Sequence, residues 1–74
     1  MAIVFKLESI EPNRRVVIQR EVVEELRWSI SRHGQLEPIV IFQQGLSFRI
    51  IDGEKRWRAI KRLGKATILV ELEK

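Results

Sequence analysis

The sequence contains no cysteine, one histidine and two prolines among its 74 residues. Without cysteine the chain cannot form a disulfide, a thiolate metal site or a thiol nucleophile. With a single histidine we expect no zinc site in a monomer, because zinc sites combine several histidine and cysteine ligands. No apolar run approaches the roughly 18 residues of a membrane helix, and the N-terminus lacks a signal-peptide pattern. We therefore expect a soluble cytoplasmic protein with no membrane contact.

Internal repeats are also lacking, so residues 1–74 are expected to form one domain. The hydrophobic residues, 45% of the chain, are enough for one modest core. A domain of this size without disulfides or metals typically has a stability of about 3–5 kcal/mol.

The net charge of +4 is concentrated in one part of the chain. The segment from Arg49 to Lys65 contains seven basic and two acidic residues, so it carries a charge of about +5 and the remainder of the chain about −1. A basic patch on one element suggests an anionic partner, such as a nucleotide, nucleic acid or acidic protein. The alternative is a solvated helix face that favours solubility.

Residues 20–33 predict a helix that ends at Gly34. At about 100° per residue, one arc of about 120° collects the apolar and small positions Val22, Val23, Leu26, Ser29, Ile30 and His33. Trp28 projects nearly opposite to this arc. Three roles stay open for it: contact with a protein partner (a second copy in the simplest case), a stacking platform, or a second buried face.

Strands are predicted for residues 2–8, 37–42, 46–51 and 66–73, where apolar residues alternate or cluster. Residues 43–45 predict a hairpin turn and residues 53–63 a second helix, whereas residues 9–15 predict a loop and residues 16–18 are too short to assign. The order β–α–β–β–α–β predicts an α+β fold, with a small mixed sheet and two helices packed against it.

The stretch from Ile50 to Gly64 predicts the end of a strand, a glycine turn and a basic helix. Asp52 is a candidate cap for that helix. The first turn of a helix leaves backbone N–H groups free and carries the positive end of the helix dipole, which is how proteins commonly hold a phosphate. Arg56 lies in that first turn, and Trp57 is expected in the core. Further basic residues extend from the turn: Lys55, Arg58, Arg62 and Lys65.

Three stretches resemble a known family. Residues 52–59 (DGEKRWRA), followed by Arg62-Leu63-Gly64, resemble the "GERR-x-RA…LG" box of ParB-type partition proteins. Residues 26–41 resemble the box "L-x-x-SI-x-x-x-GQ-x-x-PI-x-V", and residues 12–15 (PNRR) resemble its "NPRR" motif. Because the three stretches occur in the family's order over nearly the whole chain, the chain is identified as similar to the ParB/sulfiredoxin fold.

The resemblance implies a nucleotide site that holds CTP, or ATP in related members, with Mg²⁺. Gly34 and Gln35 would contact the nucleotide, and Gly53, Glu54, Lys55 and Arg56 would surround its phosphates. Glu54 is the candidate catalytic residue, with an alternative role as a first-turn acid that suits the helix dipole. Lys55, Arg58, Arg62 and Lys65 are the candidate nucleic-acid contacts, and Trp28 is the candidate interface.

Three departures from the family pattern limit what is carried over. Lys55 stands where the family has arginine, which keeps the charge but loses the bidentate fork. The family's acid–asparagine pair and its helix-turn-helix lie beyond this sequence, so we expect no sequence-specific DNA binding by this chain alone. Glu54 stands where sulfiredoxin has its catalytic cysteine, which excludes sulfinic-acid reduction.

The residues and the resemblance together leave three functions open for this chain. The first is a module that binds a nucleotide or a nucleic-acid phosphate and acts in DNA partition, plasmid or viral maintenance, or regulation through a protein partner or homodimer. The second is a metal-dependent phosphoryl-transfer enzyme: a nucleotide hydrolase, kinase or nuclease. The acids near the turn are few, namely Asp52 and Glu54, with Glu37 only if folding brings it close. The third is a purely structural interaction domain.

Overall fold

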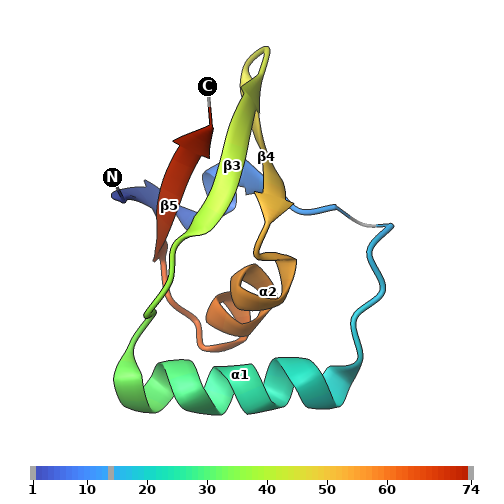
Figure 1. Cartoon of the computed structure of the whole chain (residues 1–74), viewed down its shortest axis with the longest axis vertical. Coiled ribbons are helices and arrows are strands. Elements are labelled where there is room, and N and C mark those ends of the chain that lie inside the picture. Colours follow the sequence, from blue (N-terminus) through green and yellow to red (C-terminus); the bar gives the residue numbers. More distant parts are fainter. Residues whose placement is uncertain (1, 14, 74) are drawn as a thin grey trace.

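The computed structural model describes residues 2–13 and 15–73 and has an α+β fold (Figure 1). The described residues form two α-helices and a five-stranded mixed sheet. This confirms the predicted α+β fold with a small mixed sheet. Arg14, in the stretch that resembles the NPRR motif, lies outside the described residues. The elements in chain order are β1 (Ile3–Lys6), the one-turn 3-10 helix η1 (Leu7–Ser9), β2 (Ile10–Glu11), α1 (Arg20–His33), β3 (Ile39–Gln44), β4 (Ser47–Asp52), α2 (Glu54–Arg62) and β5 (Thr67–Glu73).

The sheet has the order β1-β5-β3-β4-β2 and mixes parallel with antiparallel pairs. The hairpin of β3 and β4 is antiparallel, as the turn at Gly45 predicted, and β5 lies parallel to β3. Residues 9–15 were expected to form only a loop, and this was wrong for Ile10 and Glu11. These two residues pair in parallel with Phe48 and Arg49 of β4. A two-residue strand has no periodicity, so only its distant partner defines it.

Helix α1 has the bounds that the sequence predicted, Arg20 to His33. Gly34 ends it with a φ of 77°, and the Gly34 N–H donates to the Ile30 carbonyl at 2.8 Å. The buried stripe is narrower than expected: Val23 and Ile30 are buried, whereas Ser29 and His33 are exposed. The stripe is narrow because α1 packs chiefly against one neighbour, α2.

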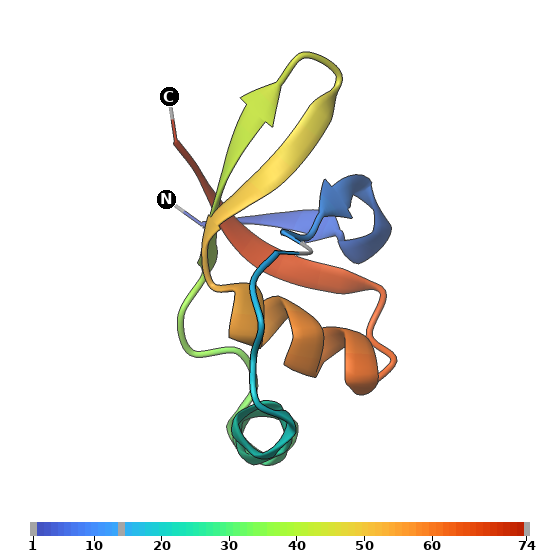
Figure 2. The same cartoon turned by 90° about the vertical axis from the view of Figure 1, so that its right-hand side faces the viewer.

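Helix α2 lies between the sheet and α1, as Figures 1 and 2 show from two sides. Its buried residues are Trp57, Ala59 and Ile60, so the prediction that Trp57 lies in the core is confirmed. Burying a side chain such as Ile60 contributes about 1.5–3 kcal/mol. The buried residues of α2 share one core with the fully buried sheet side chains Ile39, Ile41 and Val70. Within residues 2–13 and 15–73, neither helix has the length and apolar character that crossing a membrane requires.

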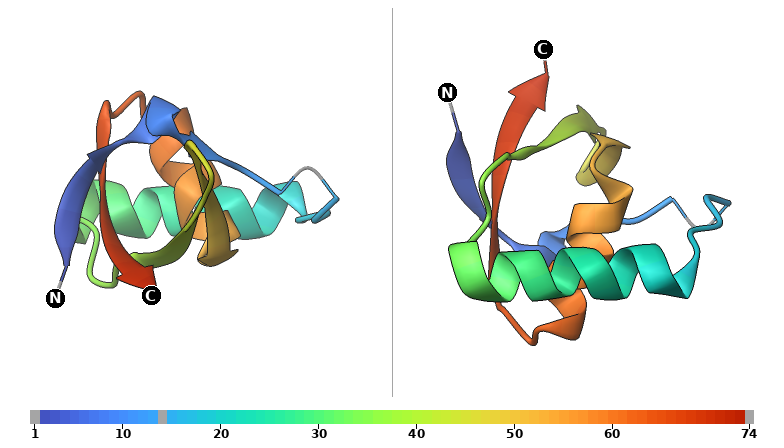
Figure 3. Two further views of the ribbon diagram at one scale, coloured as in Figure 1. Left: turned by 90° about the horizontal axis from the view of Figure 1, so that it is seen from above. Right: turned by 60° about the horizontal axis from the view of Figure 1, so that its bottom comes forward.

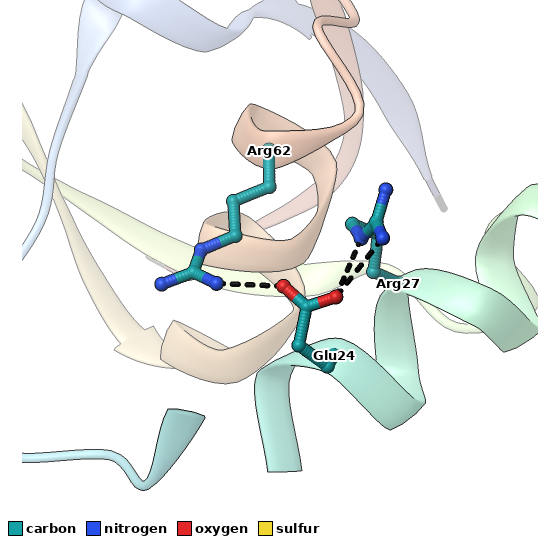
Figure 4. A network of polar contacts seen from close by, with 3 residues as sticks. All are labelled: Glu24, Arg27 and Arg62. Carbon is teal, nitrogen blue, oxygen red and sulfur yellow. Dashed lines mark hydrogen bonds and ion pairs between the residues drawn. The ribbon is translucent and has the colours of Figure 1, made fainter. Parts of the chain in front are cut away.

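An ion-pair network joins the two helices on their exposed side (Figure 4). Glu24 of α1 accepts a hydrogen bond from Arg62 of α2 at 2.7 Å and another from Arg27 at 3.0 Å. The hydrogen bond from Arg62, with that from Arg27, lowers the pKa of the Glu24 carboxyl below its ordinary value of 4.5. The charged form of Glu24 is therefore favoured in the folded state.

We expect this network to make the stability of the protein pH-dependent in the acidic range. The Glu24 carboxyl has a lower pKa folded than unfolded, so its contribution is complete above about pH 4.5 and is lost as the pH falls through the folded-state pKa. Urea unfolding at several pH values should show a smaller loss of stability below pH 4.5 in Glu24→Gln than in the wild type. Glu21→Gln, also on α1, is the control, and an equal change in both variants would contradict the role of Glu24.

Candidate functional site

The turn from β4 into α2 depends on Gly53. Its backbone has φ 107° and ψ 22°, in the left-handed region that side chains rarely adopt. A Cβ on Gly53 would lie 2.5 Å from Cγ2 of Ile39, which is completely buried. Only glycine therefore lets the turn pass this close to β3. Asp52 does not cap the helix as expected: Gly53 is the N-cap residue, no side chain caps α2, and Asp52 ends β4 opposite Val40.

The start of α2 offers free backbone donors. The first intrahelical hydrogen bond runs from the Trp57 N–H to the Gly53 carbonyl at 3.0 Å. The N–H groups of Glu54, Lys55 and Arg56 precede it and have no acceptor within the helix. The helix dipole adds positive partial charge at the same end. These features suit an anion.

This turn lines an open cleft of about 880 Å³. One wall is the turn with the start of α2, and the other is the N-terminal half of α1 with the connection before it, visible beside α2 in Figures 1 and 3. The cleft has a charged end at Gly53, Glu54, Lys55 and Arg56. Aliphatic side chains form most of the remaining lining: Val16, Val17, Ile18, Val22, Leu26, Ile50 and Ile51. The arrangement suits a ligand with an anionic group and an uncharged part.

Glu54 and Arg58, one turn apart on α2, hold the residues that precede α1. Glu54 Oε1 accepts the Asn13 N–H at 2.9 Å, and Arg58 Nη2 donates to the Val16 carbonyl at 2.7 Å. The other oxygen, Glu54 Oε2, is buried 3.5 Å from Arg58 Nε, with no hydrogen-bond partner among the described residues. The Glu54 side chain is only 10% exposed. Its carboxylate supports the cleft wall, and its catalytic role stays a prediction.

Arg56 lines the cleft and is already paired. Its Nη2 donates to Oε2 of Glu37 at 2.7 Å. Glu37 comes from the connection between α1 and β3, 19 residues earlier in the chain. The Arg56 side chain is 27% exposed and that of Glu37 is 72% exposed. The predicted phosphate-binding arginine therefore holds a carboxylate of the same chain.

Gly34 and Gln35 do not line this cleft. The Gln35 amide instead bonds the backbone of Leu69 in β5: Nε2 donates to the Leu69 carbonyl at 2.9 Å, and the Leu69 N–H donates to Oε1 at 2.8 Å. Nε2 also donates to the Glu37 carbonyl at 2.9 Å. The side chain thus extends the β3–β5 pairing beyond the start of β3. A contact of Gly34 or Gln35 with a nucleotide stays a prediction.

The predicted nucleic-acid residues fall into two groups. Lys55 in the first turn of α2 and Lys65 in the connection from α2 to β5 are exposed, whereas Arg58 is bonded to Val16 and Arg62 to Glu24. Trp28 is 61% exposed, and the Arg32 guanidinium lies 5.1 Å from its ring centroid. No group of three or more His, Cys, Asp or Glu that could hold a metal ion occurs in residues 2–13 and 15–73.

Sequence reasoning missed the contacts made across the chain. Glu37 was considered only as an acid that folding might bring near the turn, and its pairing with Arg56 had no local signal. The apolar wall at Val16 and Val17 was left unassigned. A short valine pair between a loop and a helix is a weak signal, since apolar residues that stay exposed are common. Val17, at 93% exposure, gains meaning only from its place in the cleft.

The mixed sheet, the two stacked helices and the glycine turn define an α+β domain of the ParB/sulfiredoxin class. Residues 3–74 match the family model of the ParB N-terminal domain, and the chain belongs to this family. The chain is 39% identical over 65 residues to the nucleoid occlusion protein of Oceanobacillus iheyensis, an alignment that covers 81% of this chain and 23% of that protein. It is 38% identical over 68 residues to the probable chromosome-partitioning protein ParB of Campylobacter jejuni. That alignment covers 88% of this chain and 24% of that protein. The chain thus spans about a quarter of the curated relatives it matches.

Two solved structures support the same fold. The C-terminally truncated chromosome-partitioning protein ParB of Caulobacter crescentus, complexed with CTP-gamma-S, superposes with a TM-score of 0.88 at 28% identity and covers all of this chain and 44% of that one. Sulfiredoxin of Arabidopsis thaliana superposes with a TM-score of 0.90 at 28% identity and covers all of this chain and 85% of that one.

Proposed function

We propose that this domain binds a nucleoside triphosphate, with CTP as the first candidate, in the cleft beside the β4–α2 turn. The single observation that carries the proposal is the turn itself, where Gly53 brings the free N–H groups of the first turn of α2 to a cleft that Arg56 also lines. The similarity to the ParB of Caulobacter crescentus complexed with CTP-gamma-S supports CTP over other nucleotides.

Each part of the cleft would have its own role. The N–H groups of Glu54, Lys55 and Arg56 donate to phosphate oxygens, and the Arg56 guanidinium adds charge-assisted hydrogen bonds. The aliphatic lining contacts the uncharged part of the ligand. Mg²⁺ would be bound chiefly by the phosphates and water, as is usual for this ion, because the described residues offer no cluster of carboxylates. The domain would thereby serve as the nucleotide-binding part of a partition or nucleoid occlusion protein.

Calorimetric titration with CTP, ATP and GTP, each with and without Mg²⁺, tests this proposal. We expect saturable binding of at least one of them, strongest for CTP, and no binding of cytidine at the same concentrations, because the phosphates carry the interaction. Absence of saturable binding for all three nucleotides would remove the nucleotide function.

DNA is the second candidate ligand. The exposed Lys55 and Lys65 favour contact with phosphates of a duplex without sequence preference. The internal partners of Arg58 and Arg62 leave fewer free cations for this purpose, which favours the nucleotide. If DNA is the ligand, the affinity for duplexes of unrelated sequence should be equal and should fall steeply with salt.

The outer face of α1 is the proposed surface for self-association. Glu21, Glu25, Trp28 and Arg32 are exposed and, at spacings of three and four residues, form one stripe along α1, the outermost helix in Figure 2. Two such stripes packed antiparallel would place Glu25 of each copy against Arg32 of the other, with the Trp28 rings between them. Sedimentation should then show a smaller mass for Trp28→Ala than for the control Leu46→Ala, which alters a fully exposed apolar residue of the hairpin. Equal masses would remove this surface.

A further inference from the structure

The ion pair of Arg56 with Glu37 has a consequence for the proposed ligand site. The Glu37 carboxylate is an anion bound to Arg56 Nη2 at 2.7 Å, the length of a charge-assisted hydrogen bond. A phosphate oxygen that bonds the same N–H of Nη2 would need the position that Glu37 Oε2 occupies. A phosphate that bonds another of the five guanidinium N–H groups would lie close to the Glu37 carboxylate, and two negative groups this close repel each other.

Glu37 is held at this position by its own backbone. The Gln35 amide donates to the Glu37 carbonyl and also bonds Leu69 of β5, so the connection before β3 is tied to the sheet. The Glu37 carboxylate therefore meets Arg56 from a fixed point. Its side chain is 72% exposed, which lets it turn into solvent when another anion takes the arginine.

We propose that Glu37 is an internal competitor for the phosphate position on Arg56 and so determines how tightly the cleft binds phosphate. This inference rests on the proposed nucleotide-binding function and adds a specificity-determining residue to it. A phosphate on Arg56 must either displace Glu37 from the shared N–H or bind beside its negative charge, whereas a ligand without phosphate gains nothing by displacing it. Glu37 thereby weakens the binding of every phosphate that uses Arg56.

The variant Glu37→Gln tests the competition, because it removes the negative charge and keeps the size of the side chain. Exposed ion pairs are weak, so we expect inorganic triphosphate and CTP to bind about two- to fivefold more tightly to Glu37→Gln than to the wild type. The gain should shrink at about 1 M salt, where charges are screened within about 3 Å. Glu73→Gln is the control, because it also removes one exposed negative charge. Glu73 lies on β5 and pairs with Phe42, near the end of β3 that is farther from Glu37.

The outcomes separate this inference from the proposed function. Tighter binding in Glu37→Gln, with no change in Glu73→Gln, supports the competitor. Unchanged or weaker binding in Glu37→Gln, with the wild type still binding CTP, overturns it and shows that Glu37 instead orients Arg56 or plays no part. If neither the wild type nor Glu37→Gln binds CTP or inorganic triphosphate, the proposed function fails, and this inference fails with it.

Discussion

Replacing Gly53 with alanine should destabilise the protein by about 2–5 kcal/mol and remove ligand binding at the cleft. The left-handed backbone at φ 107° costs about 1–2 kcal/mol for a residue with a side chain. The added methyl group would lie 2.5 Å from Ile39 Cγ2 and 2.8 Å from its Cβ, and such overpacking costs about 1–3 kcal/mol more. Because Ile39 is completely buried in the sheet, it has little room to move.

Gly45→Ala is the matched control for this variant. Gly45 also has a positive φ, 63°, but nothing lies within 4 Å of a Cβ placed there. It should therefore show only the backbone penalty of about 1–2 kcal/mol. Urea unfolding of the wild type and both variants measures the difference. Equal destabilisation in the two variants would mean that the β4–α2 turn does not need the close approach of Gly53 to Ile39.

Replacing Arg56 with alanine should weaken the binding of a nucleoside triphosphate by about 10- to 100-fold. Hydrogen bonds to charged groups contribute about 1.5–3 kcal/mol, and each 1.4 kcal/mol is a factor of ten in affinity. The fold should tolerate the change, because the lost partner Glu37 is mostly exposed and remains hydrated. The affinity of Arg56→Lys should lie between those of the wild type and Arg56→Ala, since lysine keeps the positive charge but loses the planar guanidinium that forms two parallel hydrogen bonds.

Arg49→Ala controls for the loss of one positive charge. Arg49 lies on β4 and, like Arg56, pairs with a glutamate, here Glu11 at 3.4 Å, but it does not line the cleft. Titration of CTP into the three proteins should show normal affinity for Arg49→Ala and weak binding for Arg56→Ala. Should both variants bind as the wild type does, the phosphate position lies elsewhere on the domain.

Local chemistry explains which parts of the fold were predictable. The bounds of α1 follow from a continuous helical pattern that ends at a glycine, and the buried Trp57 follows from its place on the apolar side of α2. The turn at Gly53 was recognised from neighbouring residues alone, because a strand, a glycine and a basic helix follow one another directly. The capping role of Asp52 was wrong, since Gly53 takes the N-cap position in a backbone conformation that the sequence does not display.

Distant pairing explains what was missed. Glu37 meets Arg56 across 19 residues, Gln35 meets Leu69 across 34, and Glu24 meets Arg62 across 38. None of these separations matches a helical or strand period, so no window of sequence contains the signal. Such contacts form only because α2 is held between α1 and the sheet, and because β5 lies beside β3.

The sequence by itself determined the helices, most of the strands and the family, and it supplied the hypothesis that residues 53–56 bind phosphate, because each depends on residues close together in the chain. The tertiary structure alone decided what the charged side chains do. It turned Arg58 and Arg62 from a presumed basic surface into ties within the fold, and it placed a carboxylate on Arg56. The physical reason is that a charged side chain takes its role from the nearest opposite charge or backbone carbonyl, and folding chooses that neighbour.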